Sequence, residues 1–177
     1  MRVRGSGLLA AILLFVPSHA PAQNPFLAGN NATAVTPANV AAAQPEGVVE
    51  AVRAVGYGAT LARDGQGDPM INLNIEGAPA LILFYGCDEG ARCRTLGLRV
   101  SYNIAGIWPA EKVAQWNAGN RFARAWADGE GDPVLQMDLI PGETGIPQST
   151  FGTSFLTFVQ LKREMERFID WPRSAAR

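Results

Sequence analysis

The chain has 177 residues, of which 47% are hydrophobic, with a formal net charge of −1 at pH 7. This length suits one domain of ordinary size with a sizeable core. The charge argues against a nucleic-acid-binding protein, which needs a basic surface. The composition therefore predicts one globular domain that does not bind nucleic acid.

The first 22 residues have the pattern of a secretory signal peptide. Arg2 and Arg4 precede an apolar run from Leu8 to Val16, and Ala20-Pro21-Ala22 forms an A-x-A cleavage site before Gln23. The run is too short to span a bilayer, so we expect no stable membrane anchor after cleavage near Ala22/Gln23. The pattern predicts a periplasmic or secreted protein. The alternative is a buried N-terminal helix.

Loss of residues 1–22 would change the chemistry available to the chain. The remainder carries 13 basic and 16 acidic residues, a net charge of −3, and His19, the only histidine, leaves with this segment. A chain without histidine lacks the commonest general base and metal ligand of proteins. We therefore expect no metal, no cofactor and no enzymatic activity.

Residues 23–44 are uncharged and rich in Ala, Asn, Pro and Thr, which predicts a disordered leader. The folded domain is predicted over residues 45–172, followed by a short disordered tail at 173–177. Within the domain, hydrophobic periodicity predicts the following order: a helix at 46–55, strands at 57–61, 71–75, 81–85 and 96–102, a helix at 109–118, strands at 121–128 and 135–139, and a helix at about 147–171.

This order, α-β-β-β-β-α-β-β-α, predicts an α+β domain with an antiparallel sheet of about six strands and helices packed on it. The last helix carries an apolar stripe at steps of three and four residues. Lys162 and Glu166 lie one turn apart outside that stripe, and we expect both on the water-facing side of the helix. The stripe comprises Phe151, Phe155, Phe158, Leu161, Met165 and Phe168.

The strand predicted at 121–128 is the candidate binding segment. Phe122, Arg124 and Trp126 share one face of such a strand, and three alanines share the other. If the first face is exposed, two aromatic rings flank a positive group, a composition typical of interface anchors. Arg121 is likewise available for a carboxylate or peptide. The alternative is that Phe122 and Trp126 belong to the core and Arg124 to an internal ion pair.

Cys87 and Cys93 lie at the end of one predicted strand and the start of the next. Antiparallel neighbours bring such positions within disulfide range, and an oxidising compartment keeps the bond formed. A redox centre more often uses C-x-x-C, and a structural zinc site needs two further ligands. We therefore predict a structural disulfide.

Two similar segments, Asp64–Pro69 and Asp128–Pro133, combine aspartate, glycine and proline. These residue types are typical of tight turns, whereas a calcium loop needs six or more oxygen ligands. Asp128 and Asp132 are also the candidate acid–base pair of a small hydrolase, although the segment lacks the apolar neighbours that tune catalytic carboxylates. We interpret both segments as turns and keep the hydrolase as an alternative.

Three parts of the chain form a recognisable set: Val55-Gly56-Tyr57, Leu83–Cys87 with Cys93, and Trp116-Asn117 followed by Arg121–Trp126. Together they resemble the YbjN family of bacterial sensory transduction regulators. The resemblance covers about residues 46–171. It implies a twisted sheet like that of type III secretion chaperones and no enzymatic activity. Many family members look cytosolic, whereas this chain has an export pattern.

Within this resemblance, we expect Trp116 to pack its helix onto the sheet and Asn117 to cap the end of that helix. The predicted function is a non-enzymatic exported domain that binds a protein or peptide in the cell envelope, in a chaperone-like or regulatory role. Its partner is unknown, and a homodimer is one candidate assembly. The alternatives are the hydrolase and a purely structural envelope protein. The predicted binding residues are Arg121, Phe122, Arg124 and Trp126.

Overall fold

The computed structural model describes residues 39–171 of the chain. The predictions of a signal peptide at 1–22, of disorder at 23–38 and of a disordered tail at 173–177 lie outside these residues. Within the described range, no helix combines the length and hydrophobicity needed to cross a membrane.

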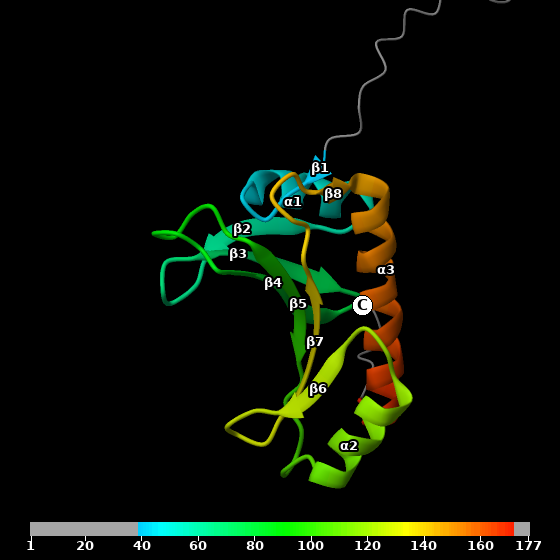
Figure 1. Cartoon of the computed structure of the whole chain (residues 1–177). Helices are drawn as coiled ribbons and strands as arrows, with labels where there is room; N and C mark the ends of the chain where they lie inside the picture. The colour runs from blue at the N-terminus through cyan, green and yellow to red at the C-terminus, as the bar shows by residue number, and fades with distance from the viewer. Residues whose placement is uncertain (1–38, 172–177) are drawn as a thin grey trace, which may run out of the picture. The chain divides into compact units, whose positions relative to one another are not determined.

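One six-stranded antiparallel sheet and three helices make up most of the described chain (Figure 1). The helices are α1 (Pro45–Ala54), α2 (Ala110–Gly119) and α3 (Gln148–Phe168). This architecture confirms the predicted α+β class and the predicted element order. In spatial order the strands are β2 (Ala59–Arg63), β3 (Pro69–Ile75), β4 (Ala78–Tyr85), β5 (Thr95–Ser101), β7 (Pro133–Leu139) and β6 (Arg124–Ala127).

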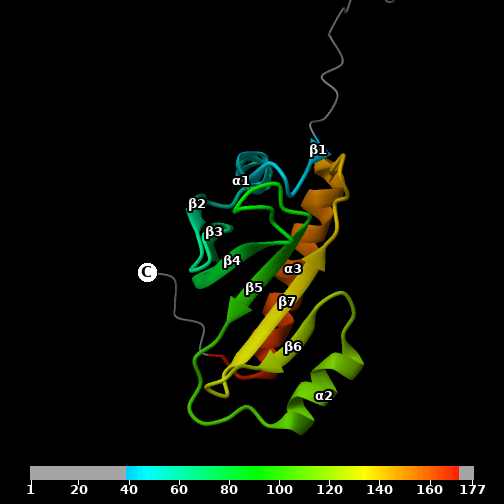
Figure 2. The same cartoon turned by 60° about the vertical axis from the view of Figure 1, so that its left-hand side comes forward.

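The sheet buries one face against α3. Along β3, buried Ile71 and Leu73 alternate with exposed Asn72 and Asn74, as expected when successive side chains point to opposite faces. Helix α3 runs along this inner face, and the opposite face of β5, β7 and β6 carries no helix (Figure 2). We call this uncovered face the open face. The α3 side chains fully buried against the sheet include Phe151, Phe155, Phe158 and Met165.

A second, two-stranded sheet joins the start of the domain to the segment before α3. Strand β1 (Asn39–Val40) pairs antiparallel with β8 (Ile146–Pro147). Val40 and Ala42 are buried in the core. The prediction of a disordered leader over 23–44 is therefore wrong for residues 39–44. Their small apolar side chains add to the core through contacts with distant elements, which local composition does not reveal.

Strand β6 starts three residues later than predicted. Phe122 has a backbone φ of 72°, in the left-handed region that an extended strand does not use. The prediction of a strand from residue 121 is therefore wrong, and Phe122 does not share a strand face with Arg124 and Trp126. The alanine face is confirmed at Ala123 and Ala125, which are both buried.

Lys162 and Glu166 do not face water, which corrects the sequence interpretation of α3. The Lys162 side chain is fully buried, and its Nζ lies 2.6 Å from Glu166 Oε1. The same Nζ is 4.0 Å from Oε2 of Glu76, which lies in the turn between β3 and β4. Neighbouring Arg163 forms an ion pair with Glu76, and this carboxylate raises the pKa of Arg163 above its usual value. The β3–β4 turn therefore covers the side of α3 that the sequence assigned to solvent.

Candidate functional site

The open face carries a connected cluster of polar and aromatic side chains, which we call the open-face cluster. It consists of Tyr85, Arg99, Arg124, Trp126 and Gln136. The strand register places Arg99 opposite Gln136, and Gln136 opposite Arg124. Residues that pair directly across strands share a face, so these three side chains form one row over β5, β7 and β6.

Hydrogen bonds fix the middle of this cluster. Arg99 Nε donates to Gln136 Oε1 at 2.8 Å, and Arg99 Nη2 donates to the Tyr85 hydroxyl at 3.2 Å. The Tyr85 hydroxyl donates in turn to Gln136 Oε1, and Gln136 Nε2 donates to Asp138 Oδ1. Gln136 is only 2% exposed. Because a buried amide needs partners, this network holds Arg99 in a defined orientation.

Gly97 leaves room for the network. A Cβ atom at this position would lie 2.8 Å from Tyr85 Cε2 and 2.9 Å from Gln136 Nε2. Real Cβ contacts essentially never come this close, so the two side chains occupy the space that any other residue at position 97 would need. Strand β5 therefore has glycine at position 97, where the side chains of Tyr85 and Gln136 pack over its backbone.

Two guanidinium groups lie against the Trp126 ring. The Arg124 Cζ is 4.7 Å from the ring centroid and the Arg99 Cζ is 5.4 Å from it. Both distances are within the range of cation–π attraction. Arg124 is exposed, and its guanidinium has no hydrogen-bond acceptor or ion pair among residues 39–171. The donors of Arg124 can therefore bind a carboxylate from outside the domain.

The structure separates the four predicted binding residues into two pairs. Arg124 and Trp126 belong to the open-face cluster. Arg121 and Phe122 lie in the loop before β6, where the Arg121 Cζ is 4.9 Å from the Phe122 ring centroid. Neither Phe122 nor Trp126 belongs to the hydrophobic core. The alternative that placed both aromatic rings in the core is therefore wrong.

Trp116 and Asn117, which belong to the segments that resemble the family, make contacts within the domain. Trp116 is 2% exposed and its ring lies 5.6 Å from that of Phe168 in α3, centroid to centroid. Asn117 does not cap α2, which corrects the prediction. Its Oδ1 accepts from Ala125 N–H and its Nδ2 donates to Ala125 C=O, while Asn120 supplies the contacts to the end of the helix.

Cys87 and Cys93 are joined by a disulfide, as predicted from their positions. The bond closes the loop between β4 and β5, next to the Tyr85 end of the open-face cluster. The loop also contains an ion pair between Arg94 and Asp88.

The two aspartate-rich segments are turns with the same hydrogen bonds. Asp64 Oδ1 accepts from the N–H groups of Gln66 and Asp68. Asp128 Oδ1 accepts from the equivalent N–H groups of Glu130 and Asp132. Across residues 39–171, no group of three or more acidic, histidine or cysteine side chains could hold a metal ion.

Asp132 is also occupied by a backbone contact. Its Oδ1 accepts from the N–H of Ile104, in the segment that follows β5. Both carboxylates of the hydrolase alternative thus accept from backbone N–H groups, Asp128 within its turn and Asp132 from Ile104, and the geometry gives that alternative no support.

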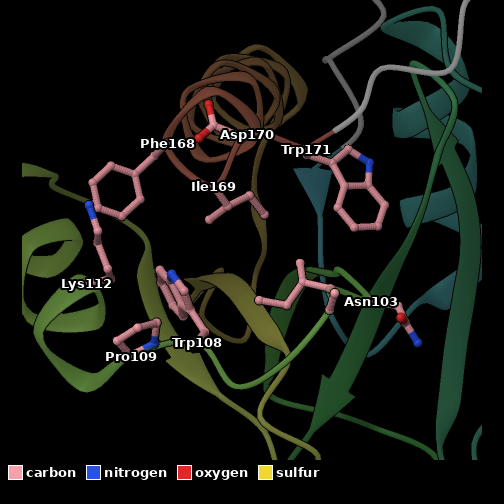
Figure 3. Close-up of a pocket in the computed structure, with 10 residues that line it drawn as sticks. Asn103, Trp108, Pro109, Lys112, Phe168, Ile169, Asp170 and Trp171 are labelled. Carbon is pink, nitrogen blue, oxygen red and sulfur yellow. The ribbon is translucent and has the colours of Figure 1, made fainter.

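A separate cavity of about 530 Å³ lies where the chain enters α2 and leaves α3 (Figure 3). Its walls include the rings of Trp108, Phe168 and Trp171, with Lys112 at one side. The Lys112 Nζ lies 5.4 Å from the Phe168 ring centroid. None of the predicted site residues lines this cavity.

Sequence reasoning did not identify Tyr85, Arg99 or Gln136 as site residues. Arg99 and Gln136 each stand between two apolar residues of their strands, and such alternating positions point to one face. This signal could have selected them, but their meeting depends on the pairing of β5 with β7, which lie far apart in the sequence.

Comparison with known proteins identifies the domain. A family model described as "YbjN: Putative bacterial sensory transduction regulator" matches residues 44–171. No curated protein matches the chain. The matched range includes all three helices, the whole six-stranded sheet and the disulfide. The chain therefore belongs to the YbjN family.

Proposed function

We propose that this protein is a non-enzymatic, exported YbjN domain that binds an acidic segment of a partner protein on its open face. The observation that carries the proposal is the pair of guanidinium groups of Arg99 and Arg124, which lie 5.4 and 4.7 Å from the centroid of the half-buried Trp126 ring. Arginine matches carboxylate geometry with two parallel donors, and tryptophan provides rigid apolar contact area. The family description, which names a regulator, agrees with a binding role.

The face is a better candidate than either sheet edge for this partner. On the edge strand β6, the side chain of Asn117 already bonds the N–H and C=O of Ala125. On the opposite edge strand β2, Arg53 Nη2 donates to the carbonyl of Ala59 at 2.9 Å. Addition of a partner strand requires free backbone groups, and both edges have some of theirs occupied.

The compartment is part of the proposal. The sequence pattern of residues 1–22 favours export, and a disulfide such as Cys87–Cys93 persists in oxidising compartments. We propose a periplasmic or secreted location on these two observations together.

The binding test uses an array of acidic peptides alongside the same peptides with every carboxylate replaced by its amide. We expect the protein to retain the acidic set. Arg124→Ala should weaken this binding at least tenfold, because a hydrogen bond to a charged group contributes about 1.5–3 kcal/mol and a tenfold change is about 1.4 kcal/mol. The melting temperature should change little, because exposed cation–π contacts are worth about 0.5–1 kcal/mol.

Arg167→Ala is the matched control, because this exposed arginine lies in the last turn of α3, away from the open face. It should bind the acidic peptides as the unmodified protein does. Equal retention of acidic and amide peptides, or an equal loss in both arginine variants, would contradict the proposed site. A large fall in melting temperature for Arg124→Ala would show that this residue is structural.

A further inference from the structure

The loop before β6 exposes an aromatic ring in a strained conformation. Phe122 is 67% exposed and has a φ of 72°. A left-handed backbone is strained at a bulky residue, and such strain clusters at functional sites. The surrounding contacts maintain this conformation, because Asn120 bonds Trp116 C=O on one side of the loop and Asn117 bonds Ala125 on the other.

An apolar groove of about 630 Å³ lies between this loop and α3. Leu156, on the α3 wall of the groove, is 50% exposed and adds accessible apolar surface there. Arg121 lies on the loop wall, and Glu164 lies on the α3 wall. The groove thus combines an exposed apolar ring, an apolar wall, one positive charge and one negative charge.

We propose that this groove is a homodimer interface, in which Phe122 of each copy enters the groove of the other. In a two-fold dimer the same patch meets itself, so the patch must be complementary to itself. The patch is complementary in shape, because the exposed ring of one copy can fill the apolar groove of the other. It is complementary in charge, because Arg121 of each copy then faces Glu164 of the other.

The charges also distinguish this occupant from the partner of the open face. The open-face cluster has two arginines and suits an acidic segment, whereas the charges of Arg121 and Glu164 balance. A second copy supplies the same balanced pair in return. Because the groove involves α3 and the open face is the opposite side of the sheet, a dimer formed here leaves both open faces accessible.

Sedimentation equilibrium of the purified protein at micromolar concentrations tests the proposal. We expect a reversible dimer. Arg121→Glu and Glu164→Arg should each raise the dimer dissociation constant at least tenfold, because each places like charges in contact twice per dimer. An equimolar mixture of the two variants should restore the dimer, because both cross-contacts are then between opposite charges.

Two further variants make the result decisive. Phe122→Gly removes the ring and suits the left-handed backbone, so it should give a stable monomer. Arg167→Glu reverses an exposed charge of α3 outside the groove and should leave the dimer intact. A monomeric unmodified protein, or a mixture of the two charge variants that stays monomeric, would overturn the proposal. Neither result would affect the acidic-peptide test of the open face.

Discussion

The hydroxyl groups of Tyr102 and Tyr85 have opposite environments in the same domain. Tyr102, just after β5, is 1% exposed, and its hydroxyl has no hydrogen-bond partner among residues 39–171. The Tyr85 hydroxyl lies on the open face between Arg99 and Gln136 and bonds both. Burial of an unpaired hydroxyl costs about 1–3 kcal/mol, so the hydroxyl of Tyr102 destabilises the folded domain. The hydroxyl of Tyr85, in contrast, helps to organise the candidate site.

Tyr102→Phe should therefore raise the free energy of unfolding of the domain at pH 7 by about 1 kcal/mol. The matched variant Tyr85→Phe should lower it, because the ring stays but the bonds to Arg99 and Gln136 are lost. Urea unfolding of both variants measures this contrast. A loss of stability in Tyr102→Phe would show that its hydroxyl has a partner.

The same variant changes the pH dependence of stability. Burial, and secondarily the charge of Glu166, raises the pKa of Tyr102 above its ordinary value of 10.0. Above about pH 10 the unfolded chain releases this proton while the folded domain keeps it, so the free energy of unfolding falls as pH rises. Unfolding curves from pH 8 to 11 should show a smaller alkaline loss for Tyr102→Phe than for the unmodified protein. Parallel losses would contradict the assignment.

At the scale of secondary-structure elements, β6 is an edge strand whose exposed backbone is bonded by a side chain. Asn117 uses both ends of its amide on Ala125, at 2.8 Å for the N–H and 2.9 Å for the C=O. Unpaired groups on an edge strand favour pairing with another chain. The contact therefore positions β6, which carries Arg124 and Trp126, and also protects its edge.

Asn117→Ala should lower the free energy of unfolding by about 2 kcal/mol, because it removes two hydrogen bonds of about 1 kcal/mol each. It should also increase concentration-dependent aggregation, because the β6 edge becomes free. Urea unfolding and light scattering measure the two effects. Asn117→Asp keeps an acceptor for Ala125 N–H and loses only the donor, so its stability should be intermediate. Equal stability of all three proteins would mean that the edge contact contributes nothing.

At the scale of the whole domain, the sequence was sufficient for the class, the element order and the inner faces of the strands. These depend on local periodicity, as in the alternation of Ile71 and Leu73 with Asn72 and Asn74. It was not sufficient where a distant element changes the environment. Lys162 is buried because the turn containing Glu76 lies against α3, and Arg99 belongs to the candidate site because β5 pairs with β7. The predicted start of the strand at residue 121 was wrong for a local reason, because the alternation of side chains does not reveal the positive φ of Phe122.

Export to an oxidising compartment would leave two chemical marks on the whole chain, a new N-terminus and a closed disulfide. The intact mass of the protein isolated from the periplasm or medium should match a chain that begins at Gln23 or its cyclised form, because Ala20-Pro21-Ala22 provides the cleavage site. The denatured, unreduced protein should contain no free thiol, because Cys87 and Cys93 are bonded. The control is the chain from Gln23 made in a reducing cytoplasm, which should contain two thiols. It should still fold, because a disulfide that closes so short a loop contributes roughly 2 kcal/mol. A cytoplasmic protein that retains residues 1–22 and two free thiols would contradict export, and the open face would then require a cytoplasmic partner.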